Sequence, residues 1–299
     1  MKSSAPTVLC FGEILWDFLP SGLFAGGAPF NVAFHLHELG LDARPVSAVG
    51  RDLRGDELLR RLHDWKIPTD LVARHAGTPT GYVRARIAPA GDAHYDITRD
   101  VAWDRIVVES DTVHVASHAR ALVFGSLALR SPNNRDALTR VLGALATDAL
   151  RAFDVNLRPP FDALPLVREI ARCVTLLKLN AAEAARLAAN ESETPGREET
   201  HARAIADATG CATVCVTAGA RGAGILRDSA WTWEKGRAVV VADTVGAGDA
   251  FLAALVAGLL AKEDSDAALL ARACRLGEWV ATQRGGTPSH PREAPAGDA

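Results

Sequence analysis

The sequence lacks the features that would direct the chain to a membrane, to a secretory pathway or to nucleic acid. No run approaches the roughly 20 consecutive apolar residues that a membrane-spanning helix needs. The first residues carry one lysine and an apolar run too short for a signal peptide. The formal net charge is −3 without a basic excess, so no nucleic-acid partner is expected. We therefore expect a cytoplasmic protein, and its 299 residues, 48% of them hydrophobic, fit one large domain.

Common nucleotide and metal signatures are also absent. The chain contains no Gly-Lys pair, which excludes a P-loop. No Gly-x-Gly-x-x-Gly follows the first apolar segment, so an NAD-linked oxidoreductase lacks its fingerprint. The five cysteines include no Cys-x-x-Cys pair, and neither a disulfide framework nor a zinc site is expected. His114 and His118 are four residues apart, but we place them on a strand and its following loop, where they would not share a face.

Strand-like and helix-like segments alternate along most of the chain. The strand-like segments include residues 8–11, 46–49, 112–116, 122–124, 152–155, 175–179, 213–217 and 238–241. The helix-like segments include residues 31–39, 56–65, 131–150, 165–173, 181–188, 247–261 and 266–282. This alternation predicts an α/β fold with three layers, α/β/α, around a mostly parallel central sheet.

Two regions break this rhythm. Residues 14–24 are strand-like with a Pro-Ser-Gly turn, and residues 81–87 and 93–98 form a predicted hairpin. Short extra strands beside a parallel sheet predict a small β lid near the ligand crevice, built from about residues 13–25 and 80–100. We assign residues 1–290 to a single domain with this lid, and we expect residues 291–299 to be a disordered tail.

The motif with the clearest chemistry runs from Asp243 to Phe251, between a predicted strand and a predicted helix. Its two glycines permit a backbone that aims N–H groups at one point, where the helix N-terminus adds partial positive charge. This combination suits a phosphate. Asp249, in the same turn, would repel a phosphate and is better placed to accept a proton from an attacking hydroxyl. The alternative is a glycine-rich turn in which Asp249 only favours the helix N-terminus.

This motif resembles the second signature of the PfkB, or ribokinase-like, family of carbohydrate kinases. The matching residues are Asp243, Thr244, Gly246, Ala247, Gly248 and Asp249. The family's first signature is similar to residues 26–33, with Gly40 and Gly50 at the expected distances. The resemblance covers nearly the whole chain and implies a ribokinase-like fold. It also implies ATP-dependent phosphorylation of a sugar hydroxyl, with Asp249 as general base and the backbone of residues 246–249 as anion hole.

The resemblance further implies a site for each ligand. On the sugar side it implies Asp17, Gly26, Gly27, Asn31 and Arg158. On the ATP side it implies Asn180, Glu183, Thr217, Gly219 and Gly222, with Glu183 organising Mg²⁺ through water. A monovalent cation, K⁺, would bind beside the anion hole at Asp243, Val245, Gly285 and Ser289. Trp279 departs from the family pattern, because the final helix is usually rich in small residues near the adenine.

Within the family, the substrate is predicted by likeness alone. Residues 102–104, 125–130 and 154–161 are most similar to the fructokinase-like branch, which favours fructose. The alternatives are 2-keto-3-deoxygluconate, ribose or a nucleoside. A non-catalytic nucleotide-binding scaffold is the alternative from another class, but the base and the anion-hole glycines are present. Family members often pair through their lids, so a lid-mediated homodimer is a further hypothesis.

Overall fold

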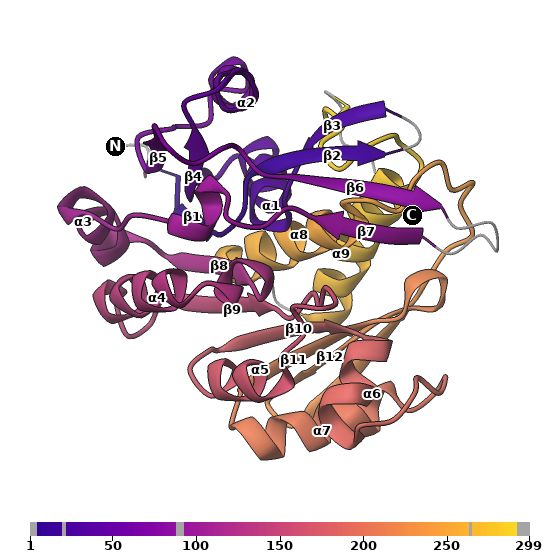
Figure 1. The fold of residues 1–299 in the computed structure, drawn as a ribbon. Helices are drawn as coiled ribbons and strands as arrows, with labels where there is room; N and C mark the ends of the chain where they lie inside the picture. The colour runs from indigo at the N-terminus through magenta and orange to yellow at the C-terminus, as the bar shows by residue number, and fades with distance from the viewer. Residues whose placement is uncertain (1–4, 20–21, 88–92, 263–264, 292–299) are drawn as a thin grey trace.

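This computed structural model describes residues 5–19, 22–87, 93–262 and 265–291. A central sheet of nine strands runs through this part of the chain (Figure 1). The strand order is β13-β12-β11-β10-β9-β8-β1-β4-β5, and only β12 and β13 pair antiparallel to their neighbours. The strands are β1 (Thr7–Phe11), β4 (Asp42–Gly50), β5 (Val72–His75), β8 (Ala121–Gly125), β9 (Leu150–Asp154), β10 (Leu176–Asn180), β11 (Thr213–Thr217), β12 (Gly222–Arg227) and β13 (Ala230–Lys235). The predicted, mostly parallel sheet is confirmed.

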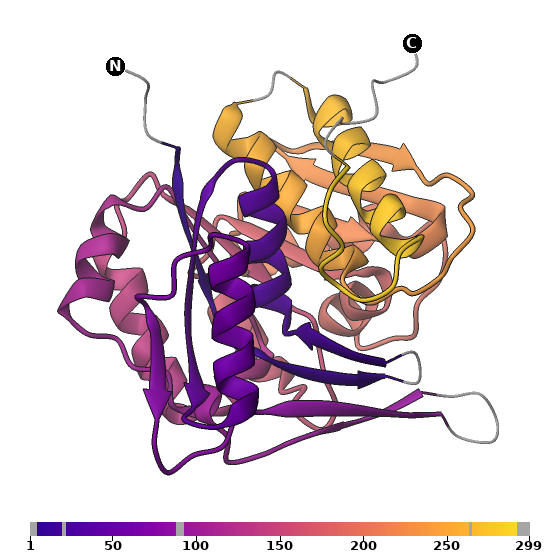
Figure 2. The same ribbon diagram turned by 90° about the horizontal axis from the view of Figure 1, so that it is seen from above.

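Helices cover both faces of this sheet. One apolar cluster joins the sheet to α1 (Ala28–Glu38), α8 (Ala247–Ala261) and α9 (Asp266–Ala281). A second cluster joins its other face to α3 (Ser110–His118), α4 (Pro132–Ala144), α5 (Leu164–Ala171), α6 (Ala181–Ala189) and α7 (Glu198–Thr209). Figure 2 shows α1 beside the C-terminal helices, although they are far apart in sequence. The three-layer α/β/α architecture is therefore confirmed.

A second sheet projects from the side of the central one (Figures 1 and 2). It contains β2 (Leu15–Leu19), β3 (Gly22–Gly26), β6 (Tyr82–Ile87) and β7 (Ala93–Ile97), in the order β3-β2-β6-β7. The two predicted hairpins are thus present, and β2 pairs parallel to β6. Helix α2 (Leu53–Asp64) packs near the base of this sheet. The turn at residues 20–21, the loop at 88–92 and the tail at 292–299 lie outside the described residues.

The prediction of a strand at residues 112–116 was wrong. These residues belong to α3, where Thr112 and Ala116 are the buried positions, four residues apart. The alternation of Val113 and Val115 with polar residues imitates a strand, but contact with α4 selects the helix. His114 and His118 consequently do share a helix face, with ring centroids 4.9 Å apart. Among the described residues no group of three or more His, Cys, Asp or Glu side chains could hold a metal ion.

The prediction of a strand at residues 238–241 was also wrong. The segment has no regular structure, and Val240 is 89% exposed. The edge of the sheet is instead occupied by the hairpin of β12 and β13, whose turn uses the left-handed residues Asp228 and Ser229. The chain then returns to the core where Ala242 and Asp243 donate backbone hydrogen bonds to the carbonyl of Ala281.

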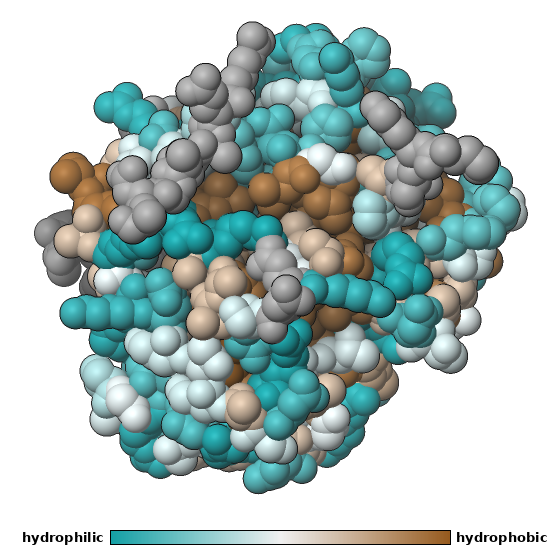
Figure 3. Space-filling view, turned by 180° about the vertical axis from the view of Figure 1, so that it is seen from behind, coloured by the Kyte–Doolittle hydropathy of each residue, from teal (hydrophilic) through white to brown (hydrophobic). Residues whose placement is uncertain are grey.

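The surface seen from behind is mostly polar, with apolar residues gathered in a band across its upper part (Figure 3). Large apolar side chains with high exposure include Leu23, Leu53 and Val240. Within the described ranges, no helix is long and apolar enough to cross a membrane.

Candidate active site

A cavity of about 320 Å³ lies under the four-stranded sheet, at the carboxyl ends of the central strands. Open parallel sheets place ligands at this edge, because the loops there converge from several strands. The predicted site residues that line the cavity are Asp17, Gly27, Asn31, Arg158, Val245, Gly246, Gly248 and Asp249. Thr244 of the second signature also lines it, and the polar lining residues that were not predicted as site residues are Glu13, Asn156 and Lys178. Residues from both signatures therefore meet in one space.

Asp249 lies in the first turn of α8 and is almost fully buried. The side-chain amide of Asn31 donates a hydrogen bond of 2.8 Å to its Oδ2 atom, across 218 residues of sequence. Burial raises the pKa of Asp249 to about 6, and the charge of Asp154 adds to this effect. The bond from Asn31 and the charges of Lys178 and Arg158 oppose it. At neutral pH Asp249 is therefore mostly ionised, with the proton affinity of a general base.

The loop that precedes Asp249 is shaped by its glycines. Gly246 is left-handed, with φ of 80°, and a Cβ atom there would lie 2.4 Å from Cα of Gly286. Helix α8 begins directly after it, and of its first-turn residues Gly248 and Asp249 line the cavity, whereas the N–H groups of Ala247 and Ala250 donate to the carbonyls of Thr244 and Gly246. A Cβ atom on Gly248 would lie 3.1 Å from Nζ of Lys178. Backbone donors and an ammonium group thus surround one point, as an anion site requires.

Lys178, at the end of β10, forms a buried ion pair with Asp154 at the end of β9. Its Nζ atom lies 2.8 Å from Oδ2 of Asp154, while Oδ1 has no hydrogen-bond partner. Burial is the largest single influence on Lys178 and opposes its charge, but the charge and hydrogen bond of Asp154 together with the charges of Asp249 and Glu183 outweigh it, so the pKa of Lys178 is raised. The sequence carried a signal for this residue, because Lys178 is the one charged side chain within the apolar strand 176–180.

Two further carboxyl groups line the opposite wall. Glu13 is 2% exposed, its Oε1 accepts a 3.2 Å hydrogen bond from the backbone N–H of Ala28, and its Oε2 has no partner. Burial raises its pKa to about 7. Asp17, on β2, has its pKa raised to about 7 by burial and by the charge of Asp249. Gly26, on the neighbouring strand β3, pairs with Leu15, and a Cβ atom there would collide with Oδ2 of Asp17. Gly26 therefore makes room for the carboxylate rather than lining the cavity.

The family model for the "pfkB family carbohydrate kinase" matches residues 22–293, which includes every part of this cavity except the β1–β2 segment. The chain belongs to the pfkB family of carbohydrate kinases. As a member, this kinase is an ATP-dependent phosphotransferase that acts on a sugar. The same match confirms the ribokinase-like resemblance of the two signatures.

Individual relatives are distant but cover most of the kinase. A putative sugar kinase of Pyrococcus horikoshii is 28% identical over 90% of this chain and 84% of the relative. Its crystal structure in complex with ATP has a TM-score of 0.79 with 25% identity and covers 95% of both chains. Fructokinase-2 of Zea mays is 28% identical over 97% of this chain and 93% of the relative. A 2-dehydro-3-deoxygluconokinase of Thermotoga maritima, at 21% identity and a TM-score of 0.81 over 97% of both chains, shares the fold.

The residues predicted on the ATP side of this kinase lie outside the cavity. Thr217, Gly219 and Gly222 follow β11, next to β10 in the sheet. Asn180 and Glu183 form a capping box at the start of α6, with bonds of 2.8 and 2.9 Å in both directions. The other carboxylate oxygen of Glu183 accepts a 2.6 Å bond from the N–H of Leu157. Each oxygen of Glu183 therefore already accepts one backbone hydrogen bond.

The residues predicted to hold a monovalent cation are partly brought together. The carboxylate of Asp243 accepts backbone hydrogen bonds from Val245 at 3.0 Å and from Gly285 at 3.3 Å. Ala247, the fourth predicted anion-hole residue, donates its N–H to the carbonyl of Thr244 at 3.3 Å. Ser289 has no hydrogen bond to this group within the described residues. The bonds to Asp243 hold the C-terminal segment against the anion-hole loop.

A histidine pair that the sequence did not reveal holds the same segment. Nε2 of the fully buried His35 donates to the carbonyl of Gly286 at 2.9 Å, because a carbonyl can only accept. Its Nδ1 lies 2.9 Å from Nε2 of His290 and therefore accepts. Burial, followed by the charge of His290, lowers the pKa of His35 to about 3, so it stays neutral. The ring of Trp279 packs edge-on against His290, with centroids 5.3 Å apart.

Proposed function

We propose that this kinase transfers the γ-phosphoryl group of ATP to a hydroxyl of a neutral sugar, with fructose as the first candidate. The observation that carries the proposal is the position of Asp249, whose carboxylate lies in a buried cavity within the same turn as the anion-hole glycines. A base next to an anion site is the arrangement that hydroxyl phosphorylation needs.

In the proposed step, the sugar oxygen attacks the γ-phosphorus while its proton passes to Asp249. The bond between the γ-phosphorus and the β,γ-bridging oxygen breaks, and ADP leaves. The first-turn N–H groups of α8, next to Gly246 and Gly248, stabilise the charge on the transferring group. Lys178 adds an ammonium near the same point. Glu183 would contact an Mg²⁺ ion bound with ATP through water, and that ion would supply neutralisation of phosphate charge.

The charge of the cavity supports a neutral acceptor. Glu13, Asp17 and Asp249 line it, whereas the lining cations among the described residues are Arg158 and Lys178. Lys178 is already paired with Asp154. Carboxylates accept hydrogen bonds from sugar hydroxyls, as the family resemblance implies for Asp17, but they repel an acid sugar or a sugar phosphate. We therefore rank fructose and ribose above 2-keto-3-deoxygluconate, and relatives named fructokinase favour fructose.

The four-stranded sheet is proposed to act as a lid. Leu15, Val83 and Ile97 from this sheet line the cavity, so the sheet covers the acceptor site. Water would compete with the sugar hydroxyl for the phosphoryl group, and a cover limits this side reaction. Leu23, 49% exposed on the outer strand β3, is compatible with the proposed lid-mediated homodimer. Sedimentation of the purified protein would test that pairing.

The decisive experiment is an ADP-release assay with Mg·ATP and K⁺ against fructose, ribose, 2-keto-3-deoxygluconate, glucose, adenosine and fructose 6-phosphate. Asp249→Asn is the matched variant, since it keeps the shape and removes the base. We expect fructose to give the highest kcat/KM and the variant to lose about 10²–10⁴-fold in kcat. Preference for another sugar with the same loss would refute fructose alone. Near-normal activity of Asp249→Asn would refute the mechanism, and omission of K⁺ tests the proposed cation.

A further inference from the structure

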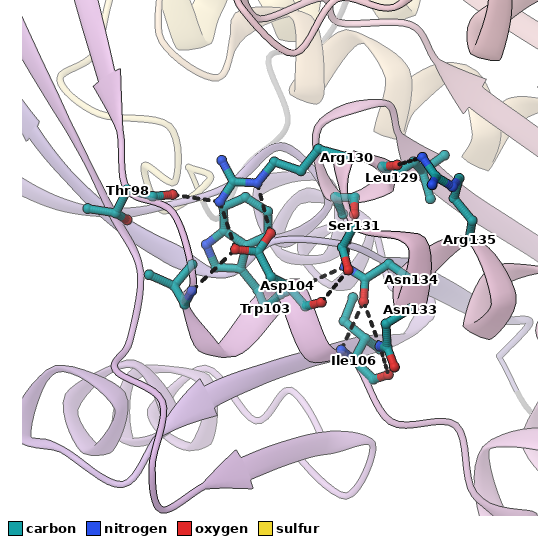
Figure 4. A network of polar contacts seen from close by, with 12 residues as sticks. Thr98, Trp103, Asp104, Ile106, Leu129, Arg130, Ser131, Asn133, Asn134 and Arg135 are labelled. Carbon is teal, nitrogen blue, oxygen red and sulfur yellow. Dashed lines mark hydrogen bonds and ion pairs between the residues drawn. The ribbon is translucent and has the colours of Figure 1, made fainter.

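Two sequence segments that resemble the fructokinase-like branch, residues 102–104 and 125–130, meet in one polar network (Figure 4). The first lies in the 3₁₀ helix η1 (Ala102–Arg105) and the second includes η2 (Leu127–Arg130). Arg130 reaches Asp104 with two hydrogen bonds, from Nε to Oδ1 at 2.8 Å and from Nη2 to Oδ2 at 2.9 Å. Its Nη2 atom also donates to the carbonyl of Thr98 at 2.6 Å.

The guanidinium of Arg130 is also held between two aromatic rings. Its central carbon lies 4.0 Å from the ring centroid of Trp103 and 4.5 Å from that of Phe161. The side chain is 8% exposed, so these contacts are shielded from water. A planar fork that bonds a carboxylate along its edge and stacks along its faces is a geometry that lysine cannot reproduce.

Three segments around Arg130 contribute residues to the lining of the substrate cavity. Thr98 directly follows β7, whose last residue Ile97 lines the cavity. Leu127, in the same 3₁₀ helix as Arg130, also lines it. Phe161 donates a 2.7 Å backbone hydrogen bond to the carbonyl of Arg158, the lining cation. The side chain of Arg130 therefore connects Thr98, which we call the lid root because it directly follows β7, with the loop that carries Arg158.

A second residue holds the two 3₁₀ helices together independently of Arg130. Asn134 is fully buried, and its amide donates 2.8 Å hydrogen bonds to the carbonyls of Trp103 and Ala128 (Figure 4). Its oxygen accepts a 2.9 Å bond from the N–H of Ile106. Because Asn134 already fixes η1 against η2, the bonds from Arg130 to Thr98 and the stacking on Phe161 serve to place the lid and the Arg158 loop.

We propose that Arg130 is a positioning residue for the acceptor sugar, which it serves by holding the lid root and the Arg158 loop at a fixed separation across the cavity. The inference rests on the proposed role of the lid and of Arg158 in the function above. It assigns the Asp104–Arg130 pair to sugar placement rather than to ATP binding, since the direct contacts of Arg130 are to Thr98, Trp103, Asp104 and Phe161. The predicted ATP-side residue Glu183 is connected to this loop only indirectly, through the hydrogen bond from the N–H of Leu157.

The test is the variant Arg130→Lys, assayed with the sugar that the wild-type enzyme phosphorylates fastest. We expect KM for the sugar to rise at least tenfold and KM for ATP to change less than twofold. We also expect the ratio of ATP hydrolysis to sugar phosphorylation to rise several-fold, because a misplaced lid admits water. Arg135→Ala is the matched control, since Arg135 makes only a 3.3 Å bond to the carbonyl of Leu129 at the edge of the network. It should keep both KM values.

Phe161→Leu provides the second variant, because it removes one stacking ring while the Asp104–Arg130 pair remains. We expect the same selective rise in KM for the sugar, about threefold or more, even if Arg130→Lys fails to fold. Unchanged KM for the sugar in the folded variants, or equal rises in both KM values, would overturn the proposal. An error in the choice of fructose is recognised separately, since it appears in the wild-type enzyme before any variant is measured.

Discussion

Two buried ion pairs flank the substrate cavity, and they differ in how completely their carboxylates are used. The pair of Asp154 and Lys178 lies beside Gly248, in the proposed anion hole, and Oδ1 of Asp154 has no hydrogen-bond partner. Asp104 and Arg130 lie under the lid root, and both oxygens of Asp104 accept hydrogen bonds from the guanidinium. Both pairs are well shielded, since each of the four side chains is at most 14% exposed.

We interpret this difference as a difference in role: the Asp154–Lys178 pair takes part in phosphoryl transfer, and the Asp104–Arg130 pair positions the walls of the cavity. Lys178 is a point charge, and Oδ1 of its partner Asp154 can still accept a hydrogen bond. The Asp154–Lys178 pair can therefore interact with a ligand or with a transferring charge. In the bidentate, stacked pair both carboxylate oxygens of Asp104 are occupied, and the nitrogen left without a hydrogen-bond partner is Nη1 of Arg130. Such a pair fixes the geometry of the groups it joins. Both pairs cost free energy to break, because removal of one member leaves a buried charge alone. Stability measurements alone therefore cannot distinguish the pairs, whereas kinetic measurements can.

Of the changes that test this comparison, Lys178→Met has the largest expected effect. We expect kcat to fall about 10²–10³-fold, because a cation beside the transferring group is lost. We expect the free energy of unfolding to fall by about 3–5 kcal/mol, since Asp154 is left unpaired. The double variant Lys178→Met/Asp154→Leu is the control: denaturant unfolding should show recovered stability, while kcat stays low. Recovery of kcat in the double variant would remove the distinction between the two pairs.

A smaller change on the catalytic side is Gly286→Ala. A Cβ atom there would lie 2.7 Å from the amide nitrogen of Asn31, which would be pushed away from Asp249. We expect kcat to fall about tenfold, because Asn31 no longer holds the carboxylate of Asp249 in position. We expect KM for the sugar to change little. Gly143→Ala is the matched control, since no atom lies within 4 Å of its Cβ position. Equal losses in both variants would show that the contact with Asn31 is irrelevant.

The smallest effect is a shift in pH dependence. Asp249 has its pKa at about 6, and it must be ionised to accept a proton, so kcat/KM rises as pH rises through about 6. The charge of Lys178 lowers this pKa, so Lys178→Met moves the acid limb to higher pH. Arg130→Lys should leave the limb in place, because Arg130 is not among the groups that shift this pKa. An equal shift of the acid limb in Lys178→Met and Arg130→Lys would contradict the proposal that the two ion pairs have different roles.

The sequence predicted the parts of the site that depend on local chain chemistry. The turn with Gly246 and Gly248 at the start of a helix predicts an anion site, because its conformation depends only on neighbouring residues. The two signatures predicted Asn31 and Asp249 as site residues. The contact between them depends on the packing of α1 against α8. The alternation of apolar segments was likewise enough for the α/β layers and for both hairpins of the lid.

What the sequence did not predict depends on tertiary partners. Residues 112–116 have a pattern compatible with strand or helix, and only packing against α4 decides between them. The valines at 239–241 look like a buried strand, but the hairpin of β12 and β13 already occupies the sheet edge. Arg130 finds Asp104 across 26 residues, and His35 finds Gly286 across 251. Such pairs have no local periodicity, so only the folded chain reveals them.

The contacts among Asn31, Asp249 and Gly286 have a consequence for synthesis of the protein. Asn31 leaves the ribosome early, whereas its partner in the hydrogen bond follows 218 residues later. The anion-hole loop then needs Gly286, against which Gly246 packs. A chain that ends before residue 286 therefore lacks the segment against which Gly246 packs, and the loop before Asp249 cannot complete its packing.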